Sequence, residues 1–275
     1  MKKKAEYIKS IEIKGLWGRK NISWTLRPDV NILSGVNGIG KSTILNHSVR
    51  SLDELEDGSL MNGTTEGVSF TFYPEDATFA DFNVIRSFDR PLISSSLMEK
   101  IGNQQVRTEL DWQIYQLQRR YLDYQVNIGN RIIALLTSGD PNDQLRAMEL
   151  SKAKTHFQDL IDRLFSETGK SIMRQRNEIY FEQDGDTLTP YQLSSGEKQM
   201  LVILLTVLIQ DFQPYTLFMD EPEISLHIEW QQQLIELIRA LNPNVQIVLT
   251  THSPALIMNG WMDAVTEVSD ISYPC

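Results

Sequence analysis

The chain has 275 residues, 41% of them hydrophobic, and a formal net charge of −10 at pH 7. This length suits one large α/β domain or two small ones. The acidic balance argues against a protein that wraps nucleic acid over its whole surface, because phosphate binding needs clustered Lys and Arg, although a local basic face stays open.

The single cysteine, Cys275, is the last residue, so an internal disulfide and a cysteine-based metal site are excluded. The longest apolar run, Met200 to Ile209, is too short to cross a bilayer, and no apolar signal-peptide core follows the N-terminal lysines. We therefore expect a soluble, cytoplasmic protein with no membrane insertion.

Alternating apolar and polar residues predict two antiparallel strands near the N-terminus, over Tyr7 to Ile13 and Asn21 to Leu26. A buried strand is predicted next, over Val30 to Leu33. Two tryptophans, Trp17 and Trp24, accompany these strands. Stacking on a nucleotide base and ordinary packing are both open for them, and packing is the more common role.

The buried strand leads into a phosphate-binding loop with the spacing G-x-x-x-x-G-K-S. Glycines are needed there because the backbone amides must turn inward around phosphate oxygens, where a Cβ would obstruct them. The lysine adds a positive charge near the β- and γ-phosphates, and the serine hydroxyl can ligate Mg²⁺. The predicted phosphate-binding residues are Gly35, Asn37, Gly38, Ile39, Gly40, Lys41, Ser42 and Thr43.

A helix is predicted from Thr43 to about Leu55, followed by strands over Val68 to Tyr73 and Asn83 to Phe88. Strand patterns then stop, and apolar residues recur mostly at spacings of three and four until Phe165. A turn at residues 139–142 divides this region into two helices that return along each other, although Gly102 and Gly129 could bend or end the first. We predict a compact helical-hairpin insertion over residues 91–167 that interrupts a domain formed by residues 1–90 and 168–275.

The last hundred residues alternate strands with helices, which indicates a mainly parallel sheet with crossovers. Alternating segments around Ile172 to Gln175 and Glu178 to Glu182 predict a short hairpin, broken by residues 184–186. The run Leu193 to Gln199 then leads into an apolar helix that ends at Ile209. A strand is predicted from Thr216 to the pair Asp220-Glu221, followed by a helix from about His227 to Leu241. The last predicted element is a buried strand from Val245 to Leu249, which precedes His252.

Each later motif is weak alone, but their order is informative. A P-loop, a Leu-Ser-x-Gly-Glu helix start, an apolar strand ending in Asp-Glu and a strand ending in His resemble the heads of ABC-type ATPases. The resemblance covers residues from about 7 to 258 except the insertion. It implies an α/β P-loop NTPase fold with a mainly parallel sheet, an antiparallel N-terminal subsheet and a helical-hairpin insertion.

Within that superfamily the chain is most similar to soluble ATPases related to the structural-maintenance-of-chromosomes, recombination-repair and overcoming-lysogenisation-defect groups. The runs Asp220 to His227 and Thr251 to Pro254 are typical of the last group and of bacterial anti-phage defence ATPases. The resemblance implies ATP and Mg²⁺ as cofactors and a head-to-tail homodimer with two composite sites.

The resemblance also implies individual roles. Asp220 would hold Mg²⁺ together with Ser42, since a hard cation prefers oxygen ligands. Glu221 would accept a proton from the attacking water, and His252 would sense the γ-phosphate, with Lys41 also in the catalytic set. In the family the signature residues face ATP held by another subunit, and here they are Ser194 and Gly196.

Several positions depart from the family pattern. Ser195 replaces the second glycine of the usual signature, Glu197 replaces a glutamine, and His227 replaces the aspartate of transporter heads. The glutamine that usually follows the P-loop helix and touches Mg²⁺ has no clear match. The candidates for it are Asp89, Gln104 and Gln105.

We predict an enzyme that binds ATP, hydrolyses it to ADP and phosphate, and dimerises head-to-tail on ATP. It would couple this cycle to nucleic acid or to a separately encoded effector such as a nuclease, in anti-phage defence or DNA metabolism. One alternative is the nucleotide-binding subunit of a membrane ABC transporter. Another is a binding module that keeps ATP as a structural ligand with negligible turnover.

Overall fold

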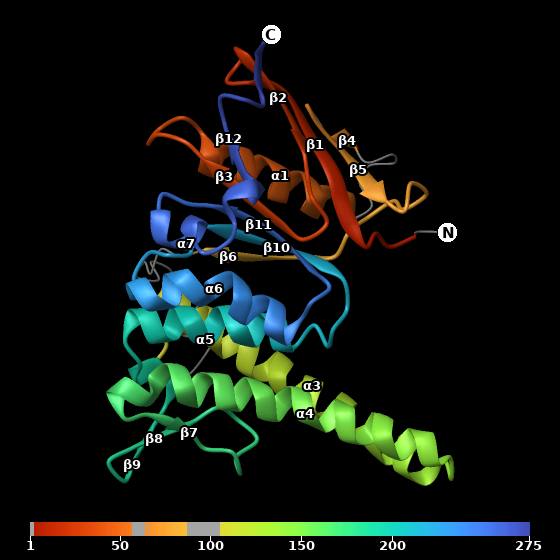
Figure 1. The fold of residues 1–275 in the computed structure, drawn as a ribbon, viewed down its shortest axis with the longest axis vertical. Coiled ribbons are helices and arrows are strands. Elements are labelled where there is room, and N and C mark those ends of the chain that lie inside the picture. The colour runs from red at the N-terminus through yellow and green to blue at the C-terminus, as the bar shows by residue number, and fades with distance from the viewer. Residues whose placement is uncertain (1–2, 57–63, 66, 87–104) are drawn as a thin grey trace. The chain divides into compact units, whose positions relative to one another are not determined.

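The computed structural model describes residues 3–56, 64–65, 67–86 and 105–275 (Figure 1). The chain forms two compact units. The first unit comprises Met1–Ser87, Phe212–Ile235 and Pro243–Cys275, and the second comprises Phe88–Asp211 and Glu236–Asn242. No helix among the described residues combines the length and the apolar character needed to span a membrane.

An antiparallel sheet in the first unit has the strand order β13-β2-β1-β5-β4. Its members are β1 (Tyr7–Leu16), β2 (Lys20–Thr25), β4 (Thr64–Thr65), β5 (Val68–Tyr73) and β13 (Ser272–Pro274). The predicted strands over residues 7–13, 21–26 and 68–73 are confirmed. β1 is longer than predicted because its register shifts after Ile13, which lets Leu16 pair with Lys20.

A parallel sheet in the same unit has the order β12-β3-β11-β10-β6. Its members are β3 (Val30–Ser34), β6 (Phe82–Arg86), β10 (Tyr215–Asp220), β11 (Val245–Thr250) and β12 (Val265–Glu267). Every residue of β10 and β11 is buried, which explains their continuous apolar runs, since strands covered on both faces need no polar alternation. The parallel sheet and the antiparallel N-terminal sheet agree with the predicted fold class.

Helix α1 (Lys41–Glu56) contacts strands of both sheets in the first unit. It begins two residues before the predicted Thr43 and ends one residue beyond Leu55. The core of this unit joins side chains from both sheets and from α1, among them Ile8, Trp24, Leu33, Ile44, Phe70, Phe218 and Val248. Trp24 therefore packs in the core, and its indole N–H donates to Thr266 at 3.3 Å. The short helix α7 (Pro254–Met258) and the 3₁₀ turn η3 (Met262–Ala264) also belong to this unit.

The second unit contains the helices α3 (Glu109–Thr137), α4 (Pro141–Phe165) and α5 (Ser195–Leu208), of which α3 and α4 form a hairpin (Figure 1). Gly129 does not end the first helix, since α3 continues to Thr137. The predicted turn is confirmed, because Asp140 caps α4 and Pro141 takes the first helical position, where its missing N–H is tolerated. Helix α6 (Ile228–Leu241) begins in the first unit and ends in the second.

A small antiparallel sheet follows α4, built from β7 (Ser171–Ile172), β8 (Phe181–Gln183) and β9 (Asp186–Leu188). It has three strands where we predicted a two-stranded hairpin, because Asp184 and Gly185 both take a positive φ and turn the chain into β9. The short 3₁₀ turns η1 (Ser166–Thr168) and η2 (Pro190–Gln192) flank this sheet.

Some predicted features lie outside the described residues, namely Phe88, Asp89, Gly102 and Gln104. The boundaries predicted for the helical insertion, at residues 91 and 167, stay a prediction.

Candidate nucleotide-binding site

Three neighbouring parallel strands end at the same edge of the sheet in the first unit. β11 lies between β3 and β10, and its last residue, Thr250, pairs with Leu33 on one side and Asp220 on the other. The carboxyl ends of parallel strands are where an open α/β sheet places its ligand site. The P-loop, the Asp-Glu pair and His252 are therefore brought together by strand order, although they are far apart in sequence.

The P-loop follows β3 and leads directly into α1. Gly35, Gly38 and Gly40 have φ values of +147°, +79° and +112°, a region that residues with a Cβ rarely adopt. A Cβ on Gly40 would also lie 2.1 Å from the Cη2 atom of Trp17. Because α1 begins at Lys41, its first amides have no partner within the helix and face the loop as an anion-binding group.

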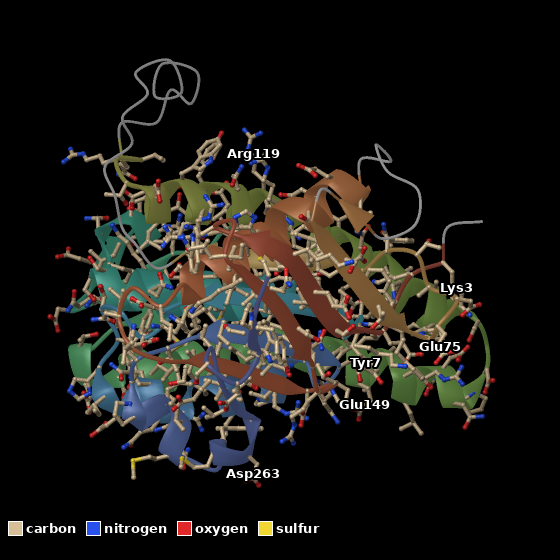
Figure 2. The ribbon with its side chains drawn as sticks, turned by 90° about the horizontal axis from the view of Figure 1, so that it is seen from above. Lys3, Tyr7, Glu75, Arg119, Glu149 and Asp263 are labelled. Atoms are coloured by element: carbon tan, nitrogen blue, oxygen red, sulfur yellow. The ribbon has the colours of Figure 1, made fainter. Side chains whose placement is uncertain are left out.

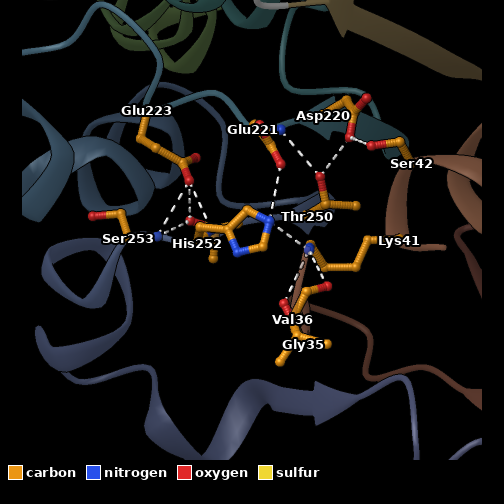
Figure 3. A network of polar contacts seen from close by, with 11 residues as sticks. Gly35, Val36, Lys41, Ser42, Asp220, Glu221, Glu223, Thr250, His252 and Ser253 are labelled. Carbon is orange, nitrogen blue, oxygen red and sulfur yellow. Dashed lines mark hydrogen bonds and ion pairs between the residues drawn. The ribbon is translucent and has the colours of Figure 1, made fainter. Parts of the chain in front are cut away.

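Lys41 is buried, with 4% of its surface exposed. Its ammonium donates hydrogen bonds to the backbone carbonyls of Gly35 at 3.0 Å and Val36 at 3.4 Å. The same Nζ atom lies 2.5 Å from Nε2 of His252 (Figure 3).

Burial lowers the pKa of Lys41 below its usual value, because removing the ammonium from water disfavours the charged form. The carboxylates of Glu221, Asp220 and Glu223 oppose this shift. The ammonium of Lys41 is therefore poorly solvated, and a bound phosphate would stabilise its charge.

Asp220, at the end of β10, is buried and accepts two hydroxyl hydrogen bonds on Oδ1. Ser42 donates one at 2.8 Å and Thr250 donates the other at 2.6 Å. Two oxygen-bearing side chains, from the P-loop and from β10, thus meet at one point (Figure 3). Hydroxyl and carboxylate oxygens are suitable ligands for Mg²⁺, which commonly takes one or two protein ligands and completes its shell with phosphates and water.

Glu221 follows Asp220 with a φ of +47°, unusual for a residue other than glycine. Its amide donates to the backbone carbonyl and to the hydroxyl of Thr250, both at 3.1 Å. Its carboxylate Oε1 lies 3.2 Å from Nε2 of His252. Backbone strain held by neighbouring hydrogen bonds is common at functional sites.

Glu223 was not among the predicted site residues, yet it organises the loop that carries His252. Its buried Oε1 accepts from the hydroxyl of Thr251 at 2.6 Å and from the amides of His252 at 2.8 Å and Ser253 at 3.2 Å (Figure 3). The sequence signal for it was its place two residues after Glu221, within the family-typical run Asp220 to His227. The hydroxyl of Thr250 was also missed, because nothing local in the sequence shows that it faces Asp220.

In the second unit, Ser194 is the N-cap of α5. Its hydroxyl accepts from the amide of Glu197, whose carboxylate accepts in return from the Ser194 amide at 2.9 Å. This reciprocal pair is a capping box, so the helix start is encoded locally. Ser194 and Ser195 are exposed and Gly196 is half-buried, which leaves the signature segment partly open to solvent within this unit.

The carboxylate of Glu197 is buried and pairs with Lys170 at 2.9 Å and with the hydroxyl of Thr168 at 2.8 Å. Burial alone would raise the pKa of Glu197. The hydrogen bonds from Lys170, Ser194 and Thr168 outweigh burial, and the pKa is lowered. Glu197 is therefore ionised. Its carboxylate holds the start of α5 against the residues that follow α4.

The remaining predicted residues have simpler surroundings. Asn37 and Gly38 are exposed, and Thr43 lies in the first turn of α1. Ile39 packs against the core of the first unit. Gln105, one of the candidates for a Mg²⁺-linked glutamine, is exposed and lines a cavity of the second unit.

A family model described as "AAA domain, putative AbiEii toxin, Type IV TA system" matches residues 70–259, more than half of the chain. The chain belongs to this AAA domain family. The match begins after the P-loop but includes Asp220, Glu221 and His252 of the site. This family assignment is consistent with the positions of the site motifs at the ends of the parallel strands.

Two curated proteins are similar to this AAA domain chain. The Septu protein PtuA of Bacillus thuringiensis is 22% identical over 307 aligned residues, which cover 91% of this chain and 72% of that protein. The probable ATPase of retron Vc95 from Vibrio cholerae serotype O1 biovar El Tor is 28% identical over 101 residues. That second match covers 33% of this chain and 20% of the relative.

Two solved structures share the fold. The Smc head bound to the C-winged helix domain of ScpA has a TM-score of 0.51 and 16% identity, covering 92% of this chain and 91% of that one. The Smc head with an extended coiled coil, bound to the C-terminal domain of ScpA derived from Pyrococcus furiosus, has a TM-score of 0.50 and 14% identity, with 98% and 96% covered. The resemblance to an ABC-like ATPase head is therefore confirmed for the fold.

Proposed function

We propose that this chain hydrolyses ATP in composite sites formed by a head-to-tail homodimer. The observation that carries the proposal is the contact network in the first unit. The Nε2 atom of His252 lies 2.5 Å from the P-loop ammonium of Lys41 and 3.2 Å from the carboxylate of Glu221. Phosphoryl transfer depends mainly on positioning and on stabilising charge, which is what such a network supplies.

Each side chain has a distinct task in this proposal. The amides of the P-loop and Lys41 bind the β- and γ-phosphates. Ser42 and Asp220 would hold Mg²⁺, which neutralises charge on the phosphates when bound. Glu221 accepts the proton of the attacking water, and His252 orients the terminal phosphate through Nε2.

The dimer is proposed because the signature segment is in the second unit and its Ser194 is exposed. A helix N-terminus with free amides favours a phosphate, and in the head-to-tail arrangement that phosphate belongs to the partner's ATP. Glu197 and the capping box fix the direction of this helix start.

The coupling of the cycle is proposed from the relatives. The resemblance to anti-phage defence ATPases, together with similarity to a Septu protein and a retron ATPase, supports a role in phage defence. The partner would be nucleic acid or a separately encoded effector such as a nuclease.

The test uses two variants in the presence of ATP and Mg²⁺. Lys41→Ala should lose nucleotide binding. Glu221→Gln should bind ATP, lose turnover and accumulate as a dimer in light scattering. A Glu221→Gln protein that stays monomeric at saturating ATP contradicts the dimer, and unchanged turnover in that variant contradicts the assignment of the base.

A complementation experiment tests the composite site directly. Lys41→Ala and Ser194→Arg proteins should each be inactive alone. A mixed dimer has one intact site, formed by the Lys41 of one protomer and the Ser194 of the other, so mixing should restore part of the turnover. No recovery on mixing, with mixed dimers present, argues that each chain completes its own site.

A further inference from the structure

A groove runs along the second unit between α3 and the segment around Tyr180. It consists of two adjoining cavities of about 210 Å³ and 420 Å³, and the second is the more open. The cavities share Leu122, Glu178 and Tyr180 as lining residues. The smaller cavity is large enough for a single planar ring system, and the larger one continues it.

Two arginines are positioned over tyrosine rings at this groove. The Cζ atom of Arg119 lies 5.0 Å from the ring centre of Tyr115, which itself stacks on Trp112 at 5.5 Å. The Cζ atom of Arg176 lies 4.7 Å from the ring centre of Tyr180. A guanidinium over an aromatic ring is held by cation–π attraction and keeps its N–H edges available.

Neither Arg119 nor Arg176 forms an ion pair with a carboxylate in the part of the chain that is described. Both are exposed, and Arg119 projects from the surface of α3 (Figure 2). By contrast, Arg174, two residues before Arg176, is paired with both Asp159 and Asp162. The two groove arginines therefore have positive charge to offer to an anion.

The groove wall is held by specific bonds. Gln118 accepts a hydrogen bond from the amide of Ile179 at 2.9 Å, and its side chain also hydrogen-bonds the hydroxyl of Tyr191. One α3 side chain thus holds both the segment that leads into β8 and the segment that leads to α5. Because Gln118 holds the segments at Ile179 and Tyr191 in place, this wall of the groove is preorganised for a ligand.

We propose that this groove binds unpaired nucleotides of a single nucleic-acid strand. Bases can stack on tyrosine rings and on guanidinium planes, while phosphates take the N–H edges of Arg119 and Arg176. Glu178, which lines both cavities and accepts from the hydroxyl of Tyr180 at 3.4 Å, can accept a hydrogen bond from the exocyclic amino group of a base and repels a phosphate. The groove therefore offers separate contacts to the bases and to the phosphates of one strand.

This groove would give the nucleic-acid partner of the proposed function a binding place on the second unit. The proposal rests on that function for its biological setting. It depends on none of the P-loop residues. The binding assay is therefore made in a Lys41→Ala background without ATP, so that the P-loop lysine cannot capture a terminal phosphate.

The experiment measures fluorescence anisotropy of labelled single strands of about 12 nucleotides, as DNA and as RNA, with the matching duplex as a control. Tyr180→Leu should weaken strand binding by about 5- to 150-fold, the range for losing one stacked base. Arg119→Gln and Arg176→Gln should each weaken it and reduce the slope of log K against log salt by about 0.7. Arg146→Gln removes an equal charge from an exposed ion pair on α4 and is the matched control.

Three outcomes overturn the proposal: duplex binding as tight as single-strand binding, displacement by polyglutamate at equal charge, or the same loss in Arg146→Gln as in Arg119→Gln. Circular dichroism and thermal unfolding of each variant separate a binding defect from a folding defect. ATP turnover of the same groove variants, assayed with Lys41 intact, separates the two proposals. Strand binding without turnover contradicts only the proposed function, and turnover without strand binding contradicts only the groove.

Discussion

The Nζ atom of Lys41 lies 2.5 Å from the Nε2 atom of His252, across a separation of 211 residues in the chain. A charged ammonium can only donate, so Nε2 of His252 is the acceptor in this contact. In that state the 3.2 Å contact between Nε2 and Glu221 cannot be a hydrogen bond. We expect a phosphate that binds Lys41 to replace this contact, so that the pair responds to nucleotide occupancy.

The lowered pKa of Lys41 predicts a pH-dependent stability. Its folded pKa lies below the unfolded value of 10.5, so between the two values the unfolded chain binds more protons and the free energy of unfolding rises with pH. Below that window the buried charge is a net cost. In urea titrations the wild type should therefore gain stability relative to Lys41→Met as pH rises toward 10.5.

The control for this titration is Lys14→Met, which removes an exposed lysine from the same unit. A difference between wild type and Lys41→Met that stays constant with pH would contradict the predicted effect of burial.

Removing Glu223 should impair turnover more than ATP binding. Glu223→Ala leaves the hydroxyl of Thr251 and the amides of His252 and Ser253 without their common acceptor. Leaving buried donors unsatisfied costs about 1–3 kcal/mol of unfolding free energy, and the position of His252 loosens. We expect a large fall in kcat with a small change in ATP affinity, and partial rescue by Glu223→Gln. Glu229→Ala, at an exposed site on α6, should change neither value.

Thr250→Val should raise the Mg²⁺ concentration needed for half-maximal turnover. The substitution removes one of the two hydroxyls that orient Asp220, while Ser42 remains. The matched control is Thr216→Val, at the other end of β10, where a buried hydroxyl donates to Gln246 at 3.0 Å. Both variants should lose about 1–3 kcal/mol of stability. An equal shift in Mg²⁺ dependence for both would show that the effect is general destabilisation.

The buried ion pair between Lys198 and Asp111 should couple α5 to the start of α3. The pair is 2.8 Å long with side chains only 11% and 3% exposed. It is mainly electrostatic, since Oδ1 of Asp111 makes no hydrogen bond of good geometry. Removing one partner of a buried pair costs about 3–5 kcal/mol, because the other charge stays buried.

A double-mutant cycle measures this coupling. Lys198→Met should be strongly destabilising, and Lys198→Met with Asp111→Asn should be less destabilising than the sum of the single changes. Lys152→Met, which breaks the exposed pair with Glu149, should change stability by less than about 0.5 kcal/mol. Additive effects at Lys198 and Asp111 would argue against any coupling between the two helices.

Local patterns predicted most elements because their causes are local. The alternation over Val68 to Tyr73 gave the bounds of β5 correctly, and Asp140 with Pro141 encodes the start of α4 by capping. Patterns failed where one turn decided the outcome, as at Asp184 and Gly185, which add β9 to the small sheet. They left the effect of Gly129 open, and α3 continues through it because a single glycine weakens a helix without ending it.

By itself the sequence determined the chemical groups: a glycine-rich loop whose backbone must adopt positive φ, a lysine, two adjacent carboxylates and a histidine at the ends of predicted strands. Only the tertiary structure decided their partners. The neighbours of Thr250, Glu223 and Trp17 depend on which strands lie side by side and on how loops fold over one another, and such contacts between distant residues leave no periodic trace in the chain.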